Sequence, residues 1–325
     1  MTVTVGINGF GRIGRCTLSH IAESARNDIQ VVKINATGPI ETNAHLLRYD
    51  SVHGRFPGEI TTTNGQLDLG RGPIDVMSTY DPQELDWEGC DVVLECTGHA
   101  NTPPIARSGL DAGAGQVLIS GPSEAAEVTV VLGANDAAMG DAQIVSNGSC
   151  TTNALAPIMR ILHDALHVEA AHMTTIHCYT GSQPTIDAPR GDMMRSRAAG
   201  LSMVPTTTSA QRLLNEVLPG IAGRIEAAAV RVPVASVSAV DLTVTLAKHV
   251  TLDDVHALFR AQTGVIGYTD KPLVSSDLRA RPESLIVALP ETRVTAGGLV
   301  RVFGWYDNEW GFSCRMLDVA QIMTT

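Results

Sequence analysis

The segment "VGINGFGRIGR" at residues 5–15 constrains the fold of this 325-residue chain more than any other stretch. It places Gly9, Gly11 and Gly14 in the spacing G-x-G-x-x-G, directly after an apolar strand-like run and at the start of a helical segment. Such a turn lets a pyrophosphate approach the backbone closely and points a helix N-terminus at the negative charge. A lone pattern of this kind can be an incidental turn, but its position at the first strand-to-helix turn predicts a dinucleotide-binding loop.

The first 150 residues alternate apolar strand-like runs with amphipathic helical segments. Helices are expected at residues 12–26 and 41–50, with a hairpin-like polar stretch at residues 59–78. The expected strands lie at residues 2–9, 29–36, 90–98, 113–121, 127–135 and 142–150. This alternation predicts parallel strands with crossover helices, hence an α/β fold with an N-terminal Rossmann doubly wound sheet.

The pattern changes at Cys150. A helix is expected at residues 150–166, followed by Val- and Thr-rich strands with few helices between them, at residues 170–180, 224–247, 283–297 and 299–307. The second half is therefore predicted to be an α+β domain with a mixed or antiparallel sheet and helices on one face. We expect residues 1–149 to form the dinucleotide-binding domain, with a C-terminal helix at about 311–325 packing back on it, and residues 150–310 to form the catalytic domain.

The charge balance and the cysteine pattern exclude several classes of partner. The chain carries 34 acidic and 23 basic residues, a formal net charge of -11, so we expect no nucleic-acid and no membrane partner. No apolar run approaches the roughly 18 residues that cross a bilayer, and no basic segment precedes the first apolar run, so a cytoplasmic location is expected. Six cysteines without disulfide density or C-x-x-C spacing predict reduced thiols and no metal site.

The residue expected to meet the adenosine ribose of a dinucleotide is unusual. An Asp or Glu generally occupies this position, about 20 residues beyond the glycine turn. Here the second strand ends in "KINATG", which places Ala36 there. An alanine removes both the hydrogen bond to the ribose and the repulsion of a 2′-phosphate. The sequence therefore predicts relaxed selectivity between NAD and NADP, or a preference for NADP.

A second candidate site is a cysteine at a strand-to-helix junction. In "SNGSCTTN", Cys150 begins the helix, where the helix dipole and backbone N–H groups lower the pKa of a thiol. His177 lies on a later strand in "TTIHCYT" and is a candidate base for this thiol. A cysteine is more often a small buried apolar residue, which is the interpretation we favour for the other five. Spacing alone leaves both interpretations of Cys150 open.

Seven segments together resemble one enzyme family. "GINGFGRIGR", "HLLRYDSVHGRF", "SNGSCTTN", "TTIHCYT", "RSRAAGLSMVPTTT", "VRVPVASVSAVDLT" and "WYDNEWGF" occur in the order and spacing typical of phosphorylating glyceraldehyde-3-phosphate dehydrogenases (type I). The resemblance runs from about Val3 to the C-terminus. It implies oxidation of D-glyceraldehyde 3-phosphate with inorganic phosphate to 1,3-bisphosphoglycerate, with NAD or NADP as cofactor.

The resemblance also implies roles for individual residues. Cys150 is the nucleophile that forms a thiohemiacetal and then a thioester, and His177 is the base. Substrate phosphate is held by Thr180 and Arg231, and attacking phosphate by Ser149, Thr208 and Arg195; Thr151 and Ser209 belong to the same phosphate-binding region. In the family the segment at residues 180–208 contacts a neighbouring subunit, so a homotetramer is expected. The implied cofactor contacts are Gly9, Gly11, Arg12, Ile13, Gly14, Ala36, Thr97, Gly98, Ser120 and Asn308.

Several positions depart from the family pattern. Ala36 replaces an aspartate, and Ala188–Pro189 replaces "LP" beside the adenosine site of the neighbouring subunit. Both changes resemble those of NADP-using members, which makes Thr37 and Arg190 candidate contacts of a 2′-phosphate. The other departures remove no catalytic group but affect the adenosine end and the phosphate sites: Tyr80, Ala154, Ser182 and Ser209.

Three other functions share part of these motifs. One is erythrose-4-phosphate dehydrogenase, which hydrolyses its thioester and tends to lose the "PTTT" hydroxyls; Thr208 and Arg195 favour phosphorylation instead. Another is a non-catalytic, cofactor-sensing protein, which is expected to lose Cys150 or His177. A semialdehyde or acyl-phosphate reductase shares the cysteine but should lack "HLLRYDSVHG" and "WYDNEWGF". The sequence therefore favours the phosphorylating dehydrogenase.

Overall fold

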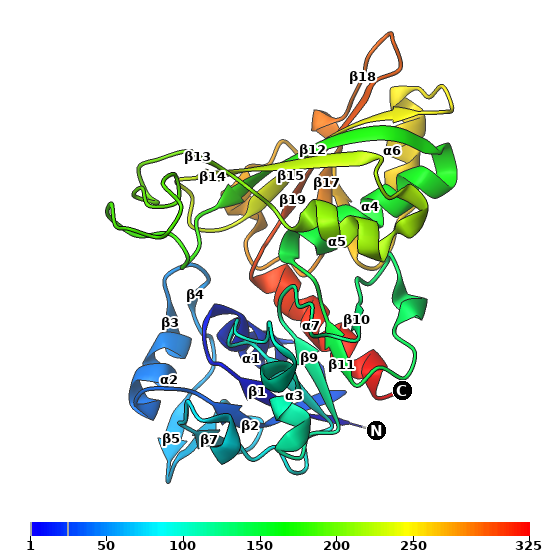
Figure 1. Ribbon diagram of the computed structural model, residues 1–325. Coiled ribbons are helices and arrows are strands. Elements are labelled where there is room, and N and C mark those ends of the chain that lie inside the picture. Colours follow the sequence, from blue (N-terminus) through cyan, green and yellow to red (C-terminus); the bar gives the residue numbers. More distant parts are fainter. Residues whose placement is uncertain (1, 25) are drawn as a thin grey trace. The chain divides into compact units, whose positions relative to one another are not determined.

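The computed structural model describes residues 2–24 and 26–325, and the chain divides into two compact units (Figure 1). The first unit comprises the described residues of Met1–Val130 together with Asn135–Ser149 and Phe312–Thr325. The second comprises Val131–Ala134 and Cys150–Gly311. Helix α7 (Trp310–Met323) therefore begins in the second unit and runs mostly in the first.

The first unit is built on a nine-stranded sheet, counted over the described residues, with the order β10-β11-β9-β8-β1-β2-β7-β6-β5. The strands from β10 to β7 are parallel, and β6 and β5 extend the sheet as an antiparallel hairpin. Strand β1 lies inside the sheet and pairs with β2 on one side and β8 on the other. The strand order therefore changes direction at β1, as in a doubly wound sheet. The bounds are β1 (Val3–Asn8), β2 (Ile29–Asn35), β5 (Thr61–Thr63), β6 (Gln66–Asp68), β7 (Ile74–Met77), β8 (Val92–Glu95), β9 (Gln116–Ile119), β10 (Val128–Thr129) and β11 (Ile144–Ser146).

The helices of this unit are α1 (Arg12–Glu23), α2 (Ile40–Arg48) and α3 (Pro103–Asp111). The helix predicted at residues 41–50 is wrong at its end, because Tyr49–Asp50 forms strand β3 and pairs with β4 (Gly54–Arg55). Gly54 has φ +90°, which permits the tight turn, and the Asp50 carboxylate accepts the backbone N–H groups of Val52 and His53. The helix predicted at residues 12–26 ends earlier, at Glu23. The strand predicted at residues 127–135 is shorter, because only Val128–Thr129 forms a strand there (β10).

The second unit contains a mixed sheet with the order β13-β14-β12-β15-β19-β17-β16, and β18 pairs with β19. Strands β12 and β14 are parallel, as are β16 and β17, and the other pairs are antiparallel. The strands are β12 (Val168–Cys178), β13 (Val204–Thr206), β14 (Ile225–Val232), β15 (Ser238–Leu246), β16 (Ile266–Thr269), β17 (Leu285–Ala288), β18 (Arg293–Val294) and β19 (Val300–Tyr306). The helices are α4 (Cys150–Leu166), α5 (Ala210–Val217) and α6 (Leu252–Arg260). Short 3-10 helices lie at Pro82–Glu84, Asp136–Ala138, Pro219–Ile221, Ser275–Leu278 and Leu289–Glu291.

Helices α4, α5 and α6 cover one face of the mixed sheet (Figure 1). Alternate residues of the strands point to this face, so Val240, Leu242 and Val244 of β15 join the core formed by α4. Ile158, on the inner side of α4, is fully buried there. The predicted α+β arrangement with a mixed sheet and helices on one face is confirmed.

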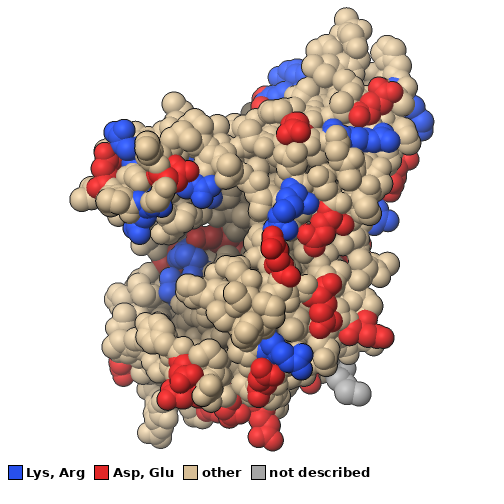
Figure 2. Space-filling model, viewed as in Figure 1, with Lys and Arg blue, Asp and Glu red and all other residues tan. Residues whose placement is uncertain are grey.

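Charged side chains are distributed without a large single-sign patch on the face shown in Figure 2, where basic and acidic residues lie close together. Within the described residues, no helix combines the length and apolar character required to cross a membrane. No disulfide joins any of the six cysteines, all of which lie within the described residues.

Candidate active site

Cys150 and His177 lie close together in the second unit. Cys150 is the first residue of α4, and His177 is the penultimate residue of β12. The Cys150 Sγ atom is 3.6 Å from Nε2 of His177. His177 is only 5% exposed, whereas Cys150 is partly exposed. The pairing that spacing alone left open is thus present as a thiol–imidazole contact, on a cysteine residue that is partly exposed.

A buried tyrosine anchors the turn that carries the thiol. The Tyr306 hydroxyl, at the end of β19, is 2.9 Å from the Thr151 hydroxyl and 2.8 Å from the Thr175 hydroxyl. Burial raises the pKa of Tyr306, so the phenol remains protonated and can donate one of these hydrogen bonds. The three hydroxyls tie the first turn of α4 to β12 and β19, which holds Cys150 opposite His177. The side-chain oxygen of Thr151 is thus engaged inside the unit.

The other nitrogen of His177 faces an arginine. Nδ1 is 2.7 Å from Nη1 of Arg231 and 2.8 Å from the carbonyl oxygen of Cys178, and the same Nη1 donates to that carbonyl at 2.9 Å. His177 and Arg231 are direct neighbours on the parallel strands β12 and β14. Strand register therefore places a fixed positive charge against the imidazole.

Burial controls the protonation of both partners. It lowers the pKa of His177 to about 4, and the nearby Arg231 charge acts in the same direction. Burial also raises the pKa of the Cys150 thiol, opposed by Arg231 and by hydrogen bonds from Thr151. The sequence predicted a lowered thiol pKa from the helix N-terminus alone. In the structure the backbone hydrogen bonds act in the predicted direction, but desolvation outweighs them.

The residues predicted to hold phosphate lie on or near β12, β13 and β14 and at the start of α4. Arg195 donates from Nε to the Thr206 hydroxyl at 2.6 Å and from Nη2 to the Thr207 hydroxyl at 3.0 Å. Those threonines belong to or follow β13, whose Val204 pairs with Arg231 of β14. Thr180 lies two residues after β12, and its hydroxyl is 2.9 Å from that of Ser182. The Thr208 hydroxyl accepts a hydrogen bond from the Ala210 N–H at 3.2 Å. Ser209 immediately precedes α5, and Ser149 immediately precedes α4.

Asn308 is held by two side chains that sequence reasoning did not connect with it. Its Oδ1 accepts hydrogen bonds from the Cys178 thiol at 3.0 Å and from the Ser238 hydroxyl at 3.4 Å. Because both partners are donors, the amide is oriented with its NH₂ group on the opposite side. Sequence analysis had treated Cys178 only as a buried apolar residue, and no sequence signal linked it to Asn308.

A cavity of about 580 Å³ lies at the glycine turn of the first unit. It opens at the carboxyl ends of β1 and β8, which is where doubly wound sheets bind ligands. Of the residues predicted to bind cofactor there, Gly9, Gly11 and Thr97 line it. Ala36 is buried just after β2, and Arg12 pairs with Asp50 rather than facing the cavity. Ile13, Gly14, Gly98 and Ser120 are likewise not among the described lining residues.

The glycine turn has the shape that a pyrophosphate requires. Gly9 has φ +94°, and a Cβ there would lie 2.7 Å from the Thr97 nitrogen. A Cβ on Gly14 would collide with the Gly9 carbonyl oxygen, so this glycine is needed for close packing of α1. A Cβ on Gly11 would meet no atom within 4 Å, which leaves free space at the start of α1. Each glycine thus suits a dinucleotide-binding turn for a different reason: Gly9 for the tight turn, Gly11 for space beside the backbone, and Gly14 for close packing of α1.

Beneath this turn lies a buried polar network that sequence analysis missed. The Asn8 amide donates to Glu95 at 2.6 Å, Glu95 also accepts the Thr97 N–H at 2.9 Å, and the Asn35 amide donates to Asn8 at 2.9 Å. Burial raises the pKa of Glu95, against the effect of these hydrogen bonds. The network joins the ends of β1, β2 and β8, and its signal in the sequence is a polar residue ending each of these apolar strands.

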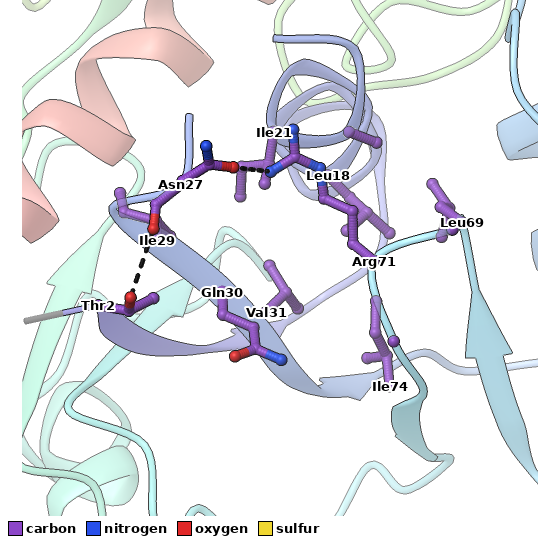
Figure 3. Close-up of a pocket in the computed structure, with 13 residues that line it drawn as sticks. Thr2, Leu18, Ile21, Asn27, Ile29, Gln30, Val31, Leu69, Arg71 and Ile74 are labelled. Atoms are coloured by element: carbon purple, nitrogen blue, oxygen red, sulfur yellow. Dashed lines mark hydrogen bonds between the residues drawn. The ribbon is translucent and has the colours of Figure 1, made fainter. Parts of the chain in front are cut away.

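A second cavity of the first unit, of about 480 Å³, contains none of the predicted site residues. Figure 3 shows its apolar wall of α1 and β2 side chains and the Arg71 side chain reaching toward Asn27. The Arg71 guanidinium donates to the main-chain carbonyls of Ser24 and Arg26, at the C-terminal end of α1. Arg71 thus binds carbonyl groups at the C-terminal end of α1, where the helix dipole makes a cation favourable.

Comparisons with known proteins agree with both units. A family model described as "Glyceraldehyde 3-phosphate dehydrogenase, NAD binding domain" matches residues 3–103, and one described as "Glyceraldehyde 3-phosphate dehydrogenase, C-terminal domain" matches residues 149–308. Proteins named glyceraldehyde-3-phosphate dehydrogenase from Cereibacter sphaeroides and Xanthobacter flavus are 49% and 48% identical, each over 99% of both chains. One from Pseudomonas aeruginosa is 47% identical over 98% of both chains.

The doubly wound sheet with its glycine turn and the separate unit bearing a thiol–imidazole pair define an NAD(P)-dependent oxidoreductase. Within that class, the chain belongs to the glyceraldehyde-3-phosphate dehydrogenase family.

The different surroundings of Gly11 and Gly14 predict different effects of the same substitution. Gly14→Ala forces the Gly9 carbonyl to move, so we expect the free energy of unfolding to fall by about 1–3 kcal/mol. Gly11→Ala has room and an ordinary φ of -78°, so stability should change by less than about 0.5 kcal/mol while dinucleotide affinity falls. Urea unfolding without ligand and fluorescence titration with NAD and NADP measure the two effects. Equal destabilisation by both variants would contradict this assignment.

Proposed function

We propose that this protein oxidises D-glyceraldehyde 3-phosphate to 1,3-bisphosphoglycerate, reversibly, with inorganic phosphate and NAD or NADP. The observation that carries the proposal is the Cys150–His177 contact of 3.6 Å with Arg231 beside it. A thiol, a base and an anion-binding guanidinium are the groups that this reaction requires at one point. Similarity to proteins named for this activity over nearly the whole chain supports the same conclusion.

Each step is assigned to a residue of this chain. Cys150 gives its thiol proton to Nε2 of His177 and adds to the aldehyde carbon. The imidazolium returns this proton to the new alkoxide, which gives a thiohemiacetal hydroxyl, and Nε2 takes the proton again as hydride leaves that carbon. The dinucleotide, when bound, accepts the hydride. Phosphate then attacks the thioester carbon, and Cys150 departs as thiolate. A neutral His177, as its lowered pKa implies, is the form that can accept a proton.

Two anion sites serve the substrate and the attacking phosphate. Arg231 and Thr180 are proposed to bind the phosphoryl group of the aldehyde, and Arg195 with Thr208 and Ser149 the free phosphate. Guanidinium and hydroxyl groups suit phosphate oxygens in geometry and charge. Arg195 is preorganised by Thr206 and Thr207, which favours phosphorolysis of the thioester over its hydrolysis. Erythrose-4-phosphate dehydrogenase activity is therefore the less supported alternative.

Stopped-flow kinetics with glyceraldehyde 3-phosphate tests the assignment. We expect a burst of NAD(P)H without phosphate, rapid turnover once phosphate is added, and loss of both in Cys150→Ser, by at least about 10³-fold, because a serine hydroxyl is a far weaker nucleophile. Cys178→Ser is the matched control: it alters the neighbouring buried thiol, can still donate to Asn308, and should retain the burst. Turnover that survives Cys150→Ser, or that is independent of phosphate with erythrose 4-phosphate, would contradict the proposal.

We further propose a preference for NADP. No carboxylate stands at residue 36 after β2, and Thr37 lines the cavity beside that position. Arg190, on the exposed segment at residues 180–208, is the candidate contact from a neighbouring subunit. A 2′-phosphate can therefore accept a hydrogen bond from the Thr37 hydroxyl and, in an assembled protein, contact the Arg190 guanidinium of a neighbouring subunit.

The preference predicts a selective effect of Ala36→Asp. The new carboxylate should weaken NADP binding by about tenfold or more, equivalent to about 1.4 kcal/mol, through charge repulsion, and should weaken NAD binding far less. Ala36→Asn has nearly the same size without the charge and should change the NAD to NADP ratio little. Dissociation constants by fluorescence titration decide the matter, and a wild-type protein that strongly prefers NAD would refute the preference.

A homotetrameric, cytoplasmic protein is proposed on family membership and on the segment at residues 180–208. This segment exposes large apolar side chains, with Met193 92% and Leu201 85% exposed, which is unfavourable unless another surface covers them. Sedimentation at micromolar concentration should give about four times the 34.4 kDa chain mass, and Met193→Glu combined with Leu201→Glu should reduce it. A monomeric wild-type protein would refute the assembly.

A further inference from the structure

Nδ1 of His177, Nη1 of Arg231 and the carbonyl oxygen of Cys178 form a closed triangle of contacts. The distances are 2.7 Å from Nδ1 to Arg231 Nη1, 2.8 Å from Nδ1 to the Cys178 carbonyl oxygen, and 2.9 Å from Nη1 to that oxygen. Guanidinium nitrogens only donate hydrogen bonds and a carbonyl oxygen only accepts them. Nδ1 can do either, but only one at a time, so one contact of the triangle is always unfavourable.

The two possible states have opposite consequences for the base. If Nδ1 carries a proton, it donates to the Cys178 carbonyl, and it then faces the Arg231 guanidinium donor-to-donor. If Nδ1 is unprotonated, it accepts from Arg231, and the single imidazole proton sits on Nε2, facing the Cys150 thiol. His177 can accept a second proton only when Nδ1 is protonated, and the Arg231 guanidinium then lies 2.7 Å from that nitrogen. Arg231 therefore opposes protonation of His177, consistent with the lowered pKa.

The contact follows from backbone pairing rather than from a mobile side chain. His177 and Arg231 occupy partner positions on β12 and β14, and His177 is buried. The other groups facing the imidazole are the Cys150 thiol at Nε2, the Cys178 thiol 3.8 Å from Nδ1, and the Tyr306 ring, which meets it edge-on at 6.0 Å. Of these neighbours, Arg231 is the one that carries a permanent charge.

Arg231 has donor capacity left over for an anion. Within the described residues, its hydrogen bonds are those of Nη1, and Nε and Nη2 have no partner. The residue is partly exposed. An oxyanion can therefore bind the guanidinium from the far side without breaking the contact with His177.

We propose that Arg231 couples anion binding to base strength: a phosphoryl dianion on Nε and Nη2 offsets the guanidinium charge and makes His177 a stronger base. The identity of the anion rests on the proposed function, whereas the coupling rests on the triangle. A phosphorylated aldehyde would thus strengthen the base that its own oxidation requires. An aldehyde without a phosphoryl group would be oxidised with a weaker base. The enzyme would thus discriminate against such an aldehyde in the rate of oxidation as well as in binding.

Histidine titration by NMR tests the coupling without cofactor or substrate. The full-length Cys150→Ser protein, labelled at histidine Cε1, removes the thiol titration, and His177→Asn in that background assigns the signal. In chloride we expect a pKa well below 6.5. In sulfate at equal ionic strength we expect it to be higher by about one unit or more, because a dianion offsets the nearby cation.

Two arginine variants separate the coupling from general anion effects. In Arg231→Met the pKa of His177 should be raised in both salts and should no longer respond to sulfate. Arg224→Met is the matched control, because Arg224 immediately precedes β14 and binds a main-chain carbonyl, that of Val168, so the sulfate response should persist. An identical pKa in both salts with Arg231 in place, or a sulfate response that survives Arg231→Met, would overturn the proposal.

Kinetics with D-glyceraldehyde gives a second readout. Phosphite dianion added in trans should raise the burst rate of NAD(P)H by about tenfold and move its acid limb to higher pH by about one unit, because a stronger base is protonated at higher pH. Arg231→Met should abolish both effects. A normal burst with glyceraldehyde 3-phosphate but no response to phosphite would refute the coupling while leaving the proposed function intact.

Discussion

The attachment of one helical turn to the mixed sheet determines the geometry of the proposed site. The Tyr306 hydroxyl joins Thr151 of α4 to Thr175 of β12, and the apolar side of α4 packs on the same sheet. This brings Cys150 to 3.6 Å from His177 although 26 residues separate them along the chain. A buried phenol between two buried hydroxyls is costly to disrupt, since each broken hydrogen bond would leave a polar group unsatisfied. The thiol is thus held in place by the core rather than by a loop.

Parallel pairing of β12 and β14 provides the second constraint. It sets His177 beside Arg231, so the proposed base and the proposed anion-binding group share one carbonyl oxygen, that of Cys178. The proposed recognition of the substrate and the proposed proton transfer are therefore electrostatically linked. The same cation lowers the pKa of the imidazole and also opposes the rise in the pKa of the thiol.

Much of the architecture could be predicted because local patterns and tertiary requirements coincide. The glycine spacing at Gly9, Gly11 and Gly14, followed by alternating strands and helices, allowed a doubly wound sheet to be predicted, and the helix at residues 150–166 was predicted with its observed bounds. Errors occurred where a short-range pattern competes with a specific turn. Residues 41–50 read as one helix, but Gly54 and the Asp50 carboxylate stabilise a hairpin that takes Tyr49 and Asp50 from its end.

The sequence by itself determined the two domain types, the nucleophile and base candidates, and the absence of a carboxylate at Ala36, because these depend on residue identity and on spacing within short segments. Only the tertiary structure decided the Nδ1 triangle, the orientation of Asn308 by Cys178 and Ser238, and the network of Asn8, Asn35 and Glu95. These contacts join strands far apart in the chain. Their hydrogen-bonding state depends on strand register and burial, which no local pattern encodes.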